Sequence, residues 1–144
     1  SAASDVYKRQ GDHAGALKDI DIVTEYVRQA LKRTITRRFA EANSLRVITV
    51  DPKVEDTIVA SVKKSEAGSY LAMDPDLIQK IVNITSGEID KVKDVIPNII
   101  ILTSPIVRIY FKKLIDQFIP NITVLSYSEI DNTAQIQAIG NIAM

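Results

Sequence analysis

The side chains that could do chemistry in this sequence are few and scattered. Its single histidine, His13, lies in a glycine-containing stretch without a neighbouring metal ligand, and there is no cysteine. A Ser-His-acid or Cys-His nucleophile system therefore lacks its members. Phosphate-binding glycine motifs and zinc-ligand spacings are also missing from the sequence. We expect no catalytic residue, no cofactor and no metal site, and therefore no enzyme.

Three polar residues, Asp51, Asp74 and Ser104, each stand directly before a proline. One interpretation places them in an acidic or anion-binding pocket at the carboxyl edge of a sheet. The alternative is helix capping, because a proline fits the first helical position and the preceding side chain accepts a hydrogen bond from a free N–H. We favour capping, which needs no ligand.

Each of these dipeptides follows a run of β-branched and aliphatic residues, at 45–50, 70–73 and 99–103. A strand that leads directly into a helix is the repeating unit of an α/β fold, and a fourth apolar run covers 122–127. The alternation of small and apolar residues over 136–142 indicates a further strand at an edge. The sequence predicts an α/β domain of βαβαβα type with a following edge strand.

Apolar residues at spacings of three and four predict four helices, at 21–42, 52–65, 75–95 and 105–119. The first is long and precedes the sheet domain, and Gly68 is expected to cap the second. The third continues through Thr85-Ser86-Gly87, where we expect a weak point. In the fourth, Leu114 and Phe118 are assigned to the core. Three basic residues of that helix are assigned to solvent: Arg108, Lys112 and Lys113.

Composition limits the function. The chain has 144 residues, 25% of them charged and 46% hydrophobic, with a formal net charge of zero. This length fits one domain, or one domain with part of a second. Zero net charge gives no global field toward nucleic acid or an anionic membrane. The apolar runs are shorter than the roughly 20 residues that cross a bilayer.

We divide the chain into four parts. Residues 1–10 contain Asp5-Val6-Tyr7-Lys8-Arg9-Gln10, which is what a transposon-end sequencing adapter encodes when read in frame, so we interpret them as an adapter scar. A native linker is the alternative. Residues 11–18 are assigned to a linker, 19–43 to the end of a helical subdomain and 44–144 to the α/β domain. The abrupt start leads us to expect a longer natural protein.

Several ordered motifs carry a family resemblance. They are NIIILTSPIVRIYFKKLI at 98–115, FIPNITVLSYSEI at 118–130, TEYVRQAL at 24–31, and the strand-Asp-Pro joints at 45–52 and 68–75. Together they resemble the C-terminal part of the flagellar and type III secretion export-gate family, FlhA and its injectisome relatives. Ser104-Pro105 and Pro120-Asn121 are more similar to the flagellar branch. Ile109 departs from the pattern, because a proline is expected there.

The resemblance implies a non-enzymatic role. Proteins of this family have a multi-span inner-membrane region and a cytoplasmic region of four subdomains that forms a ring below the export pore. The ring receives export substrates and their chaperones. The chain would then supply the end of the third subdomain and the whole fourth, at the cytoplasmic face of the bacterial inner membrane. It would reach the membrane only through an upstream region.

Five basic residues are our candidates for contacts with ring subunits or other proteins: Arg28, Lys32, Arg108, Lys112 and Lys113. A nucleic-acid surface formed by residues 28–38 is a competing interpretation, but the net charge opposes it and we expect no nucleic-acid partner. The other alternative is a small α/β ligand-binding or regulatory module. It requires a polar pocket at the carboxyl ends of the strands.

Overall fold

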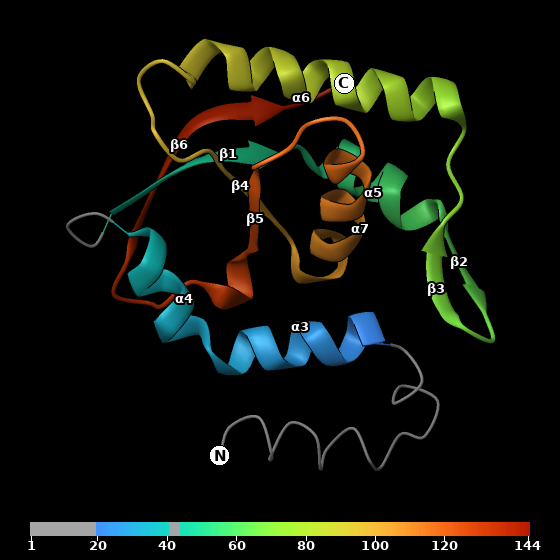
Figure 1. The fold of residues 1–144 in the computed structure, drawn as a ribbon, viewed down its shortest axis with the longest axis horizontal. Coiled ribbons are helices and arrows are strands. Elements are labelled where there is room, and N and C mark those ends of the chain that lie inside the picture. Colours follow the sequence, from blue (N-terminus) through green and yellow to red (C-terminus); the bar gives the residue numbers. More distant parts are fainter. Residues whose placement is uncertain (1–19, 41–43) are drawn as a thin grey trace.

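The computed structural model describes residues 20–40 and 44–144 (Figure 1). The predicted scar at 1–10 and linker at 11–18 therefore lie outside the described residues. The elements in chain order are α3 (Ile20–Ala30), α4 (Lys32–Phe39), β1 (Ser44–Val50), α5 (Pro52–Ala60), β2 (Val62–Ser65), β3 (Gly68–Leu71), α6 (Pro75–Val92), β4 (Ile100–Thr103), α7 (Pro105–Asp116), β5 (Thr123–Ser126), the 3-10 helix η1 (Tyr127–Glu129) and β6 (Gln135–Ile142).

The centre of the fold is a four-stranded parallel sheet in the order β5-β4-β1-β6. Helices α5, α6 and α7 pack on one face of the sheet, and α4 and η1 lie against the other. The α/β class and the edge position of the last strand are confirmed. Parallel strands need crossover connections, and two of the predicted joints, Asp51-Pro52 after β1 and Ser104-Pro105 after β4, begin such connections.

Strand β1 shows how the sequence fills both faces. Ile48 and Val50 contribute to the apolar cluster under α5, α6 and α7, whereas Leu45 and Val47 contribute to the cluster that faces α4. Alternate residues of a strand point to opposite faces, so a strand buried on both sides reads as a continuous apolar run. All four of these side chains are buried.

The predicted strand at 70–73 does not join this sheet. Residues Gly68–Leu71 pair antiparallel with Val62–Ser65 in a separate hairpin, so the helix predicted to reach Ser65 ends at Ala60. Val62 continues the four-residue spacing of Val54 and Ile58, and that spacing misled the prediction. Gly68 has a positive φ of 120°. It follows a two-residue turn and closes the hairpin, a position that favours glycine, and does not cap a helix.

The predicted helix at 21–42 is two helices that meet at Leu31. The Leu31 N–H lies 3.2 Å from both the Val27 and the Arg28 carbonyl oxygens, a shared bond typical of a helix end. The break lets α3 cross α7 and η1 while α4 packs Ile35 and Phe39 on the sheet. We call the two helices, Ile20–Phe39, the helical arm.

Helix α6 is continuous, as predicted. The hydroxyl of Thr85 is buried and donates to the Ile81 carbonyl oxygen at 2.8 Å, so its polarity is satisfied within the helix. Gly87 is exposed, and a Cβ added there would meet nothing within 4 Å. The triplet therefore does not interrupt the helix.

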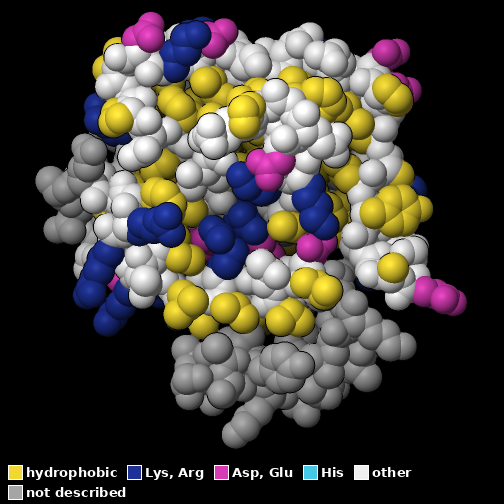
Figure 2. Space-filling model, viewed as in Figure 1, with side chains coloured by type: hydrophobic (Ala, Val, Ile, Leu, Met, Phe, Trp, Pro, Cys, Tyr) yellow, Lys and Arg dark blue, Asp and Glu magenta, His cyan; other side chains and the backbone are white. Residues whose placement is uncertain are grey.

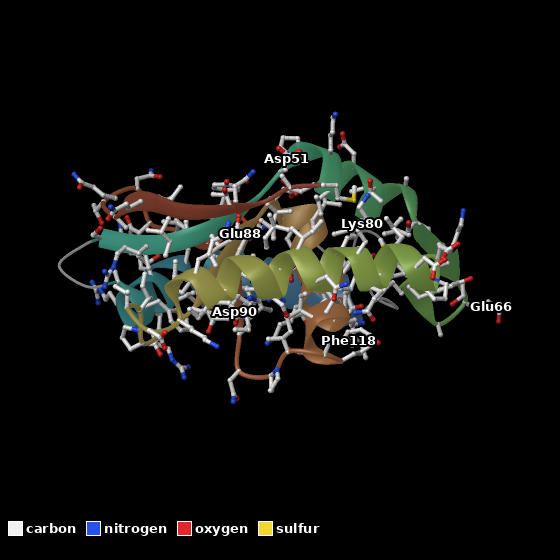
Figure 3. The ribbon with its side chains drawn as sticks, turned by 90° about the horizontal axis from the view of Figure 1, so that it is seen from above. Asp51, Glu66, Lys80, Glu88, Asp90 and Phe118 are labelled. Atoms are coloured by element: carbon white, nitrogen blue, oxygen red, sulfur yellow. The ribbon has the colours of Figure 1, made fainter. Side chains whose placement is uncertain are left out.

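Helix α7 departs from its predicted faces at two residues. Leu114 is buried as expected, but Phe118 is 48% exposed because α7 ends at Asp116, before the helical spacing reaches it. Figure 3 shows Phe118 beyond the end of α7, at the margin of the molecule. Arg108, expected in solvent, is only 4% exposed.

The polar residues before proline divide into two kinds. Asp51 accepts from the Lys53 N–H at 3.1 Å and Asp74 from the Asp76 N–H at 2.8 Å, so both are the predicted N-caps. Ser104 makes no such side-chain bond, contrary to expectation; its own N–H donates to Glu55 at 2.8 Å. Asn121 adopts a positive φ of 65° in the turn before β5. Within 20–40 and 44–144, no helix has the length and apolar character needed to cross a membrane.

Candidate partner-binding surface

Helix α3 is attached to the α/β domain chiefly by charged side chains. None of its residues is buried, and Ile20, Ile22 and Tyr26 are exposed. Apolar burial therefore contributes little to holding this helix in place. Four charged residues from three elements meet beneath it: Glu25, Arg28, Arg108 and Glu129. We call these four residues the charge cluster.

Arg108 is at the centre of the charge cluster. Its Nε lies 2.7 Å from Glu25 Oε1 and 3.5 Å from Glu129 Oε1, and its Nη1 donates to the Val124 carbonyl oxygen at 3.1 Å. One guanidinium thus connects α3, η1 and β5. Its expected exposure to solvent is wrong, because these acceptors draw it into the domain.

Glu129 is the most buried member, with a side chain that is fully inaccessible. Arg28 Nη2 lies 2.7 Å from its Oε2, and the backbone N–H and hydroxyl of Ser126 donate to its Oε1, each at 3.2 Å. A buried carboxylate is tolerated when its oxygens are bonded in this way. The motif SYSEI, quoted above for the resemblance, therefore positions a buried ion-pair partner.

The charge cluster is not fully satisfied. Glu25 Oε2 and Arg28 Nε are buried without a hydrogen-bond partner among the described residues. Burial raises the pKa of Glu25 above its ordinary value of 4.5, and the Arg108 charge offsets this rise only in part. The cluster thus connects the helical arm to the domain through contacts that are sensitive to charge.

Helix α4 adds a second attachment. The Thr36 hydroxyl donates to the Glu129 carbonyl oxygen at 3.0 Å and accepts from the Asp131 N–H at 2.9 Å. Arg33 lies 3.3 Å from the Asp131 carboxylate. The pKa of Asp131 is lowered, first by the N–H that Thr133 donates and also by the charges of Arg33 and Lys32. Both helices of the arm therefore converge on residues 129–131.

The five candidate contact residues lie on the two helices of the arm and on α7. Arg108 is enclosed, and Arg28 is 30% exposed beside Glu129. Lys112 bonds the Ile122 carbonyl oxygen at 2.8 Å and Asp116 at 2.8 Å, whereas Lys113 pairs with Asp21 of α3 at 2.5 Å. Lys32 lies on α4, partly exposed. Their role in binding partners stays a prediction.

The sequence interpretation missed Glu25 and Glu129. Both acids lie inside motifs already singled out, TEYVRQAL and SYSEI. Their pairing with Arg108 spans up to 83 residues of chain, which local spacing does not reveal. Among the described residues, no group of three or more histidine or acidic side chains could hold a metal ion.

The fold and the charge cluster define a parallel α/β domain to which a two-helix arm is attached by buried ion pairs. A model of the FHIPEP family matches residues 5–135. The chain belongs to this family, and corresponds to the C-terminal cytoplasmic region of flagellar and type III secretion export-gate proteins.

Individual relatives support the assignment. The flagellar biosynthesis protein FlhA of Bacillus subtilis (strain 168) is 36% identical over 136 residues, which cover 94% of this chain and 20% of FlhA. The chain therefore spans about a fifth of that relative's length.

Two solved structures share the fold. Nonameric EPEC SctV-C, solved by cryo-EM, matches with a TM-score of 0.76 and 28% identity over 86% of this chain and 37% of the other. A complex of the CdsV and CdsO proteins of Chlamydia pneumoniae matches with a TM-score of 0.74 and 35% identity, covering 85% of this chain and 36% of the other.

Proposed function

We propose that this chain is part of a non-enzymatic protein-export gate. Its full-length protein would form a ring at the cytoplasmic face of the bacterial inner membrane and dock export substrates and chaperones for secretion. The observation that carries the proposal is membership of the FHIPEP family over residues 5–135, together with the likeness to a nonameric relative. The helical arm and the α/β domain would be the end of the third subdomain and the fourth.

In this proposal the chain contacts other subunits of the ring. It binds chaperones and substrates through the full-length protein. The relative CdsV forms a complex with the CdsO protein, which supports a protein partner for the full-length protein. Lys113, whose side chain is 55% exposed although it pairs with Asp21, would contribute to such contacts by setting partner choice. No nucleic-acid partner is proposed.

Charge reversal at Lys112 and Lys113 in the full-length protein tests these contacts. We expect ring assembly, measured by native mass spectrometry, and export to fall, while the isolated domain stays folded. Because Lys113 also pairs with Asp21, the double change Lys113→Glu with Asp21→Lys restores the internal pair with its charges exchanged. A partner contact predicts that this double variant stays impaired.

Lys80→Glu is the matched control, because Lys80 is exposed and lies on α6, on the opposite side of the molecule from α3 (Figure 1). Full recovery by the exchanged pair would assign Lys113 to holding the arm only. Wild-type assembly and export in every variant would remove both lysines from the interface.

A further inference from the structure

An apolar groove of about 480 Å³ lies between α3, the β2–β3 hairpin and the first turns of α7. Ile22 and Tyr26 line it from the arm, Val59 from the end of α5, and Ile106 from α7. Their exposed fractions run from 36% for Ile22 to 69% for Ile106. A contiguous patch of large exposed apolar side chains is typical of an interaction site on a protein surface.

The exposure of the lining also limits the size of the occupant. Sites for small molecules enclose most of the ligand surface. A wall of side chains that are 42% to 69% exposed, as at Tyr26, Val59 and Ile106, encloses little. The groove is shallow, so its geometry suits a long element laid along it. Figure 2 shows hydrophobic side chains following α3, next to a field of mixed charge.

Charge specifies the occupant further. Two acids line the groove, but Asp21 pairs with Lys113 and Glu25 pairs with Arg108. Lys64 also lines it and takes part in no ion pair with the described residues. The groove therefore offers one uncompensated positive charge beside its apolar floor. A carboxylate on the flank of the occupant would complement that charge.

The hairpin contributes side chains to the groove. Val62 and Lys64 alternate with Lys63, so they share one face of β2, and Ser69 lies opposite Lys64 in the pairing. Because this face meets the groove, an extended peptide lying in it would gain no backbone pairing from the hairpin. A helix, which satisfies its own backbone, loses nothing there.

We propose that this groove binds an amphipathic helix of a partner protein. Its apolar ridge would fill the space over Ile22, Tyr26 and Ile106, and an acidic residue on its flank would pair with Lys64. A second copy of this chain is a weaker fit. Its α3 exposes Ile22 and Tyr26, but the acids of that helix, Asp21 and Glu25, already pair with Lys113 and Arg108. The groove lies between the helical arm and the α/β domain. The inference goes beyond the proposed function because it does not require ring formation.

The test measures binding of a synthetic fluorescent helical peptide to the full chain by fluorescence anisotropy. The peptide carries leucines at i, i+3, i+4 and i+7 with glutamates on the flank, and its companion has glutamine at each glutamate. We expect the glutamate peptide to bind more tightly than the glutamine peptide. The substitution Lys64→Gln should abolish that preference, whereas Lys80→Gln should keep it.

The apolar floor is tested by Ile106→Ser, which should weaken binding of the glutamate peptide roughly tenfold. Val95→Ser is its matched control, since Val95 is 73% exposed and lies outside the groove. Melting curves verify that both variants are folded. Equal binding of the two peptides, or no effect of Ile106→Ser, would overturn the proposal.

Two other occupants give different results. Self-association of the chain that Ile106→Ser abolishes would assign the groove to a second copy. Binding of the apolar dye anilinonaphthalene sulfonate that Ile106→Ser abolishes, without peptide binding, would assign it to a small apolar ligand. Either result would overturn a partner helix as the occupant.

Discussion

The guanidinium of Arg108 on α7 lies 2.7 Å from the carboxylate of Glu25 on α3, across 83 residues of sequence. This pair, and the contacts of Arg108 to Glu129 and to the Val124 carbonyl oxygen, join the helical arm to the sheet domain. The arm and the domain are therefore coupled electrostatically at a buried position.

Replacing Arg108 by alanine should lower the free energy of unfolding by about 3–5 kcal/mol, because two buried carboxylates would lose their shared cation. Urea denaturation measures the change. Lys80→Ala, an exposed change on α6, should stay within about 0.5 kcal/mol. Equal and small losses in the two variants would mean that the cluster does not hold the arm.

The pH dependence of stability should report on Glu25. Burial raises its folded pKa above 4.5, so the folded state holds this proton more tightly than the unfolded state does. The stability that Glu25 contributes is fully present below pH 4.5 and is lost as the pH rises through the folded pKa. The unfolding free energy of the wild type relative to Glu25→Gln should therefore fall from acidic to neutral pH.

Denaturation of both proteins across that range checks the sign. The glutamine variant is the reference, because it cannot titrate at this position. Parallel curves, or a wild type that gains relative stability toward neutral pH, would contradict a raised pKa.

Helix α7 should show unequal costs at two apolar residues. Leu114 is 3% exposed, so Leu114→Ala should cost about 2–5 kcal/mol. Phe118 is 48% exposed, so Phe118→Ala should cost clearly less than Leu114→Ala, although more atoms are removed. Denaturant melts of the two variants measure both losses of unfolding free energy. A larger loss for Phe118→Ala than for Leu114→Ala would mean that Phe118 belongs to the core.

Deletion of residues 1–10 should leave the melting temperature unchanged within about 1 °C if they are an adapter scar without core contacts. Thermal melts of the shortened and full chains provide the comparison. A drop of several degrees would show that these residues pack on the domain.

Local rules were sufficient for two of the three strand-to-helix joints. Asp51-Pro52 and Asp74-Pro75 needed only capping chemistry and the φ of proline, and both predictions are confirmed. Local rules failed where a helical spacing and a strand pairing involved the same residue. Val62 continues the helical spacing of Val54 and Ile58, yet it pairs with Leu71 in a hairpin. Local spacing does not record pairing.

The charge cluster lay beyond local rules for a different reason. Arg108 reads as a surface cation unless Glu25 and Glu129 are known to meet it, and the fold brings them together. Phe118 shows the same limit, because its phase matches Leu114 but the helix ends before it. Whether a charged side chain is buried, and where a helix ends, depend on tertiary contacts.

Motility of a Bacillus subtilis strain tests the central claim, that this domain serves in a protein-export gate. In that strain, residues 20–144 of this chain would replace the matching part of FlhA, which is 36% identical over 136 residues. The account predicts that the chimera supports swimming, and that Arg108→Ala in the graft reduces it. A chimera present in the membrane at the native level but without any motility would contradict the claim.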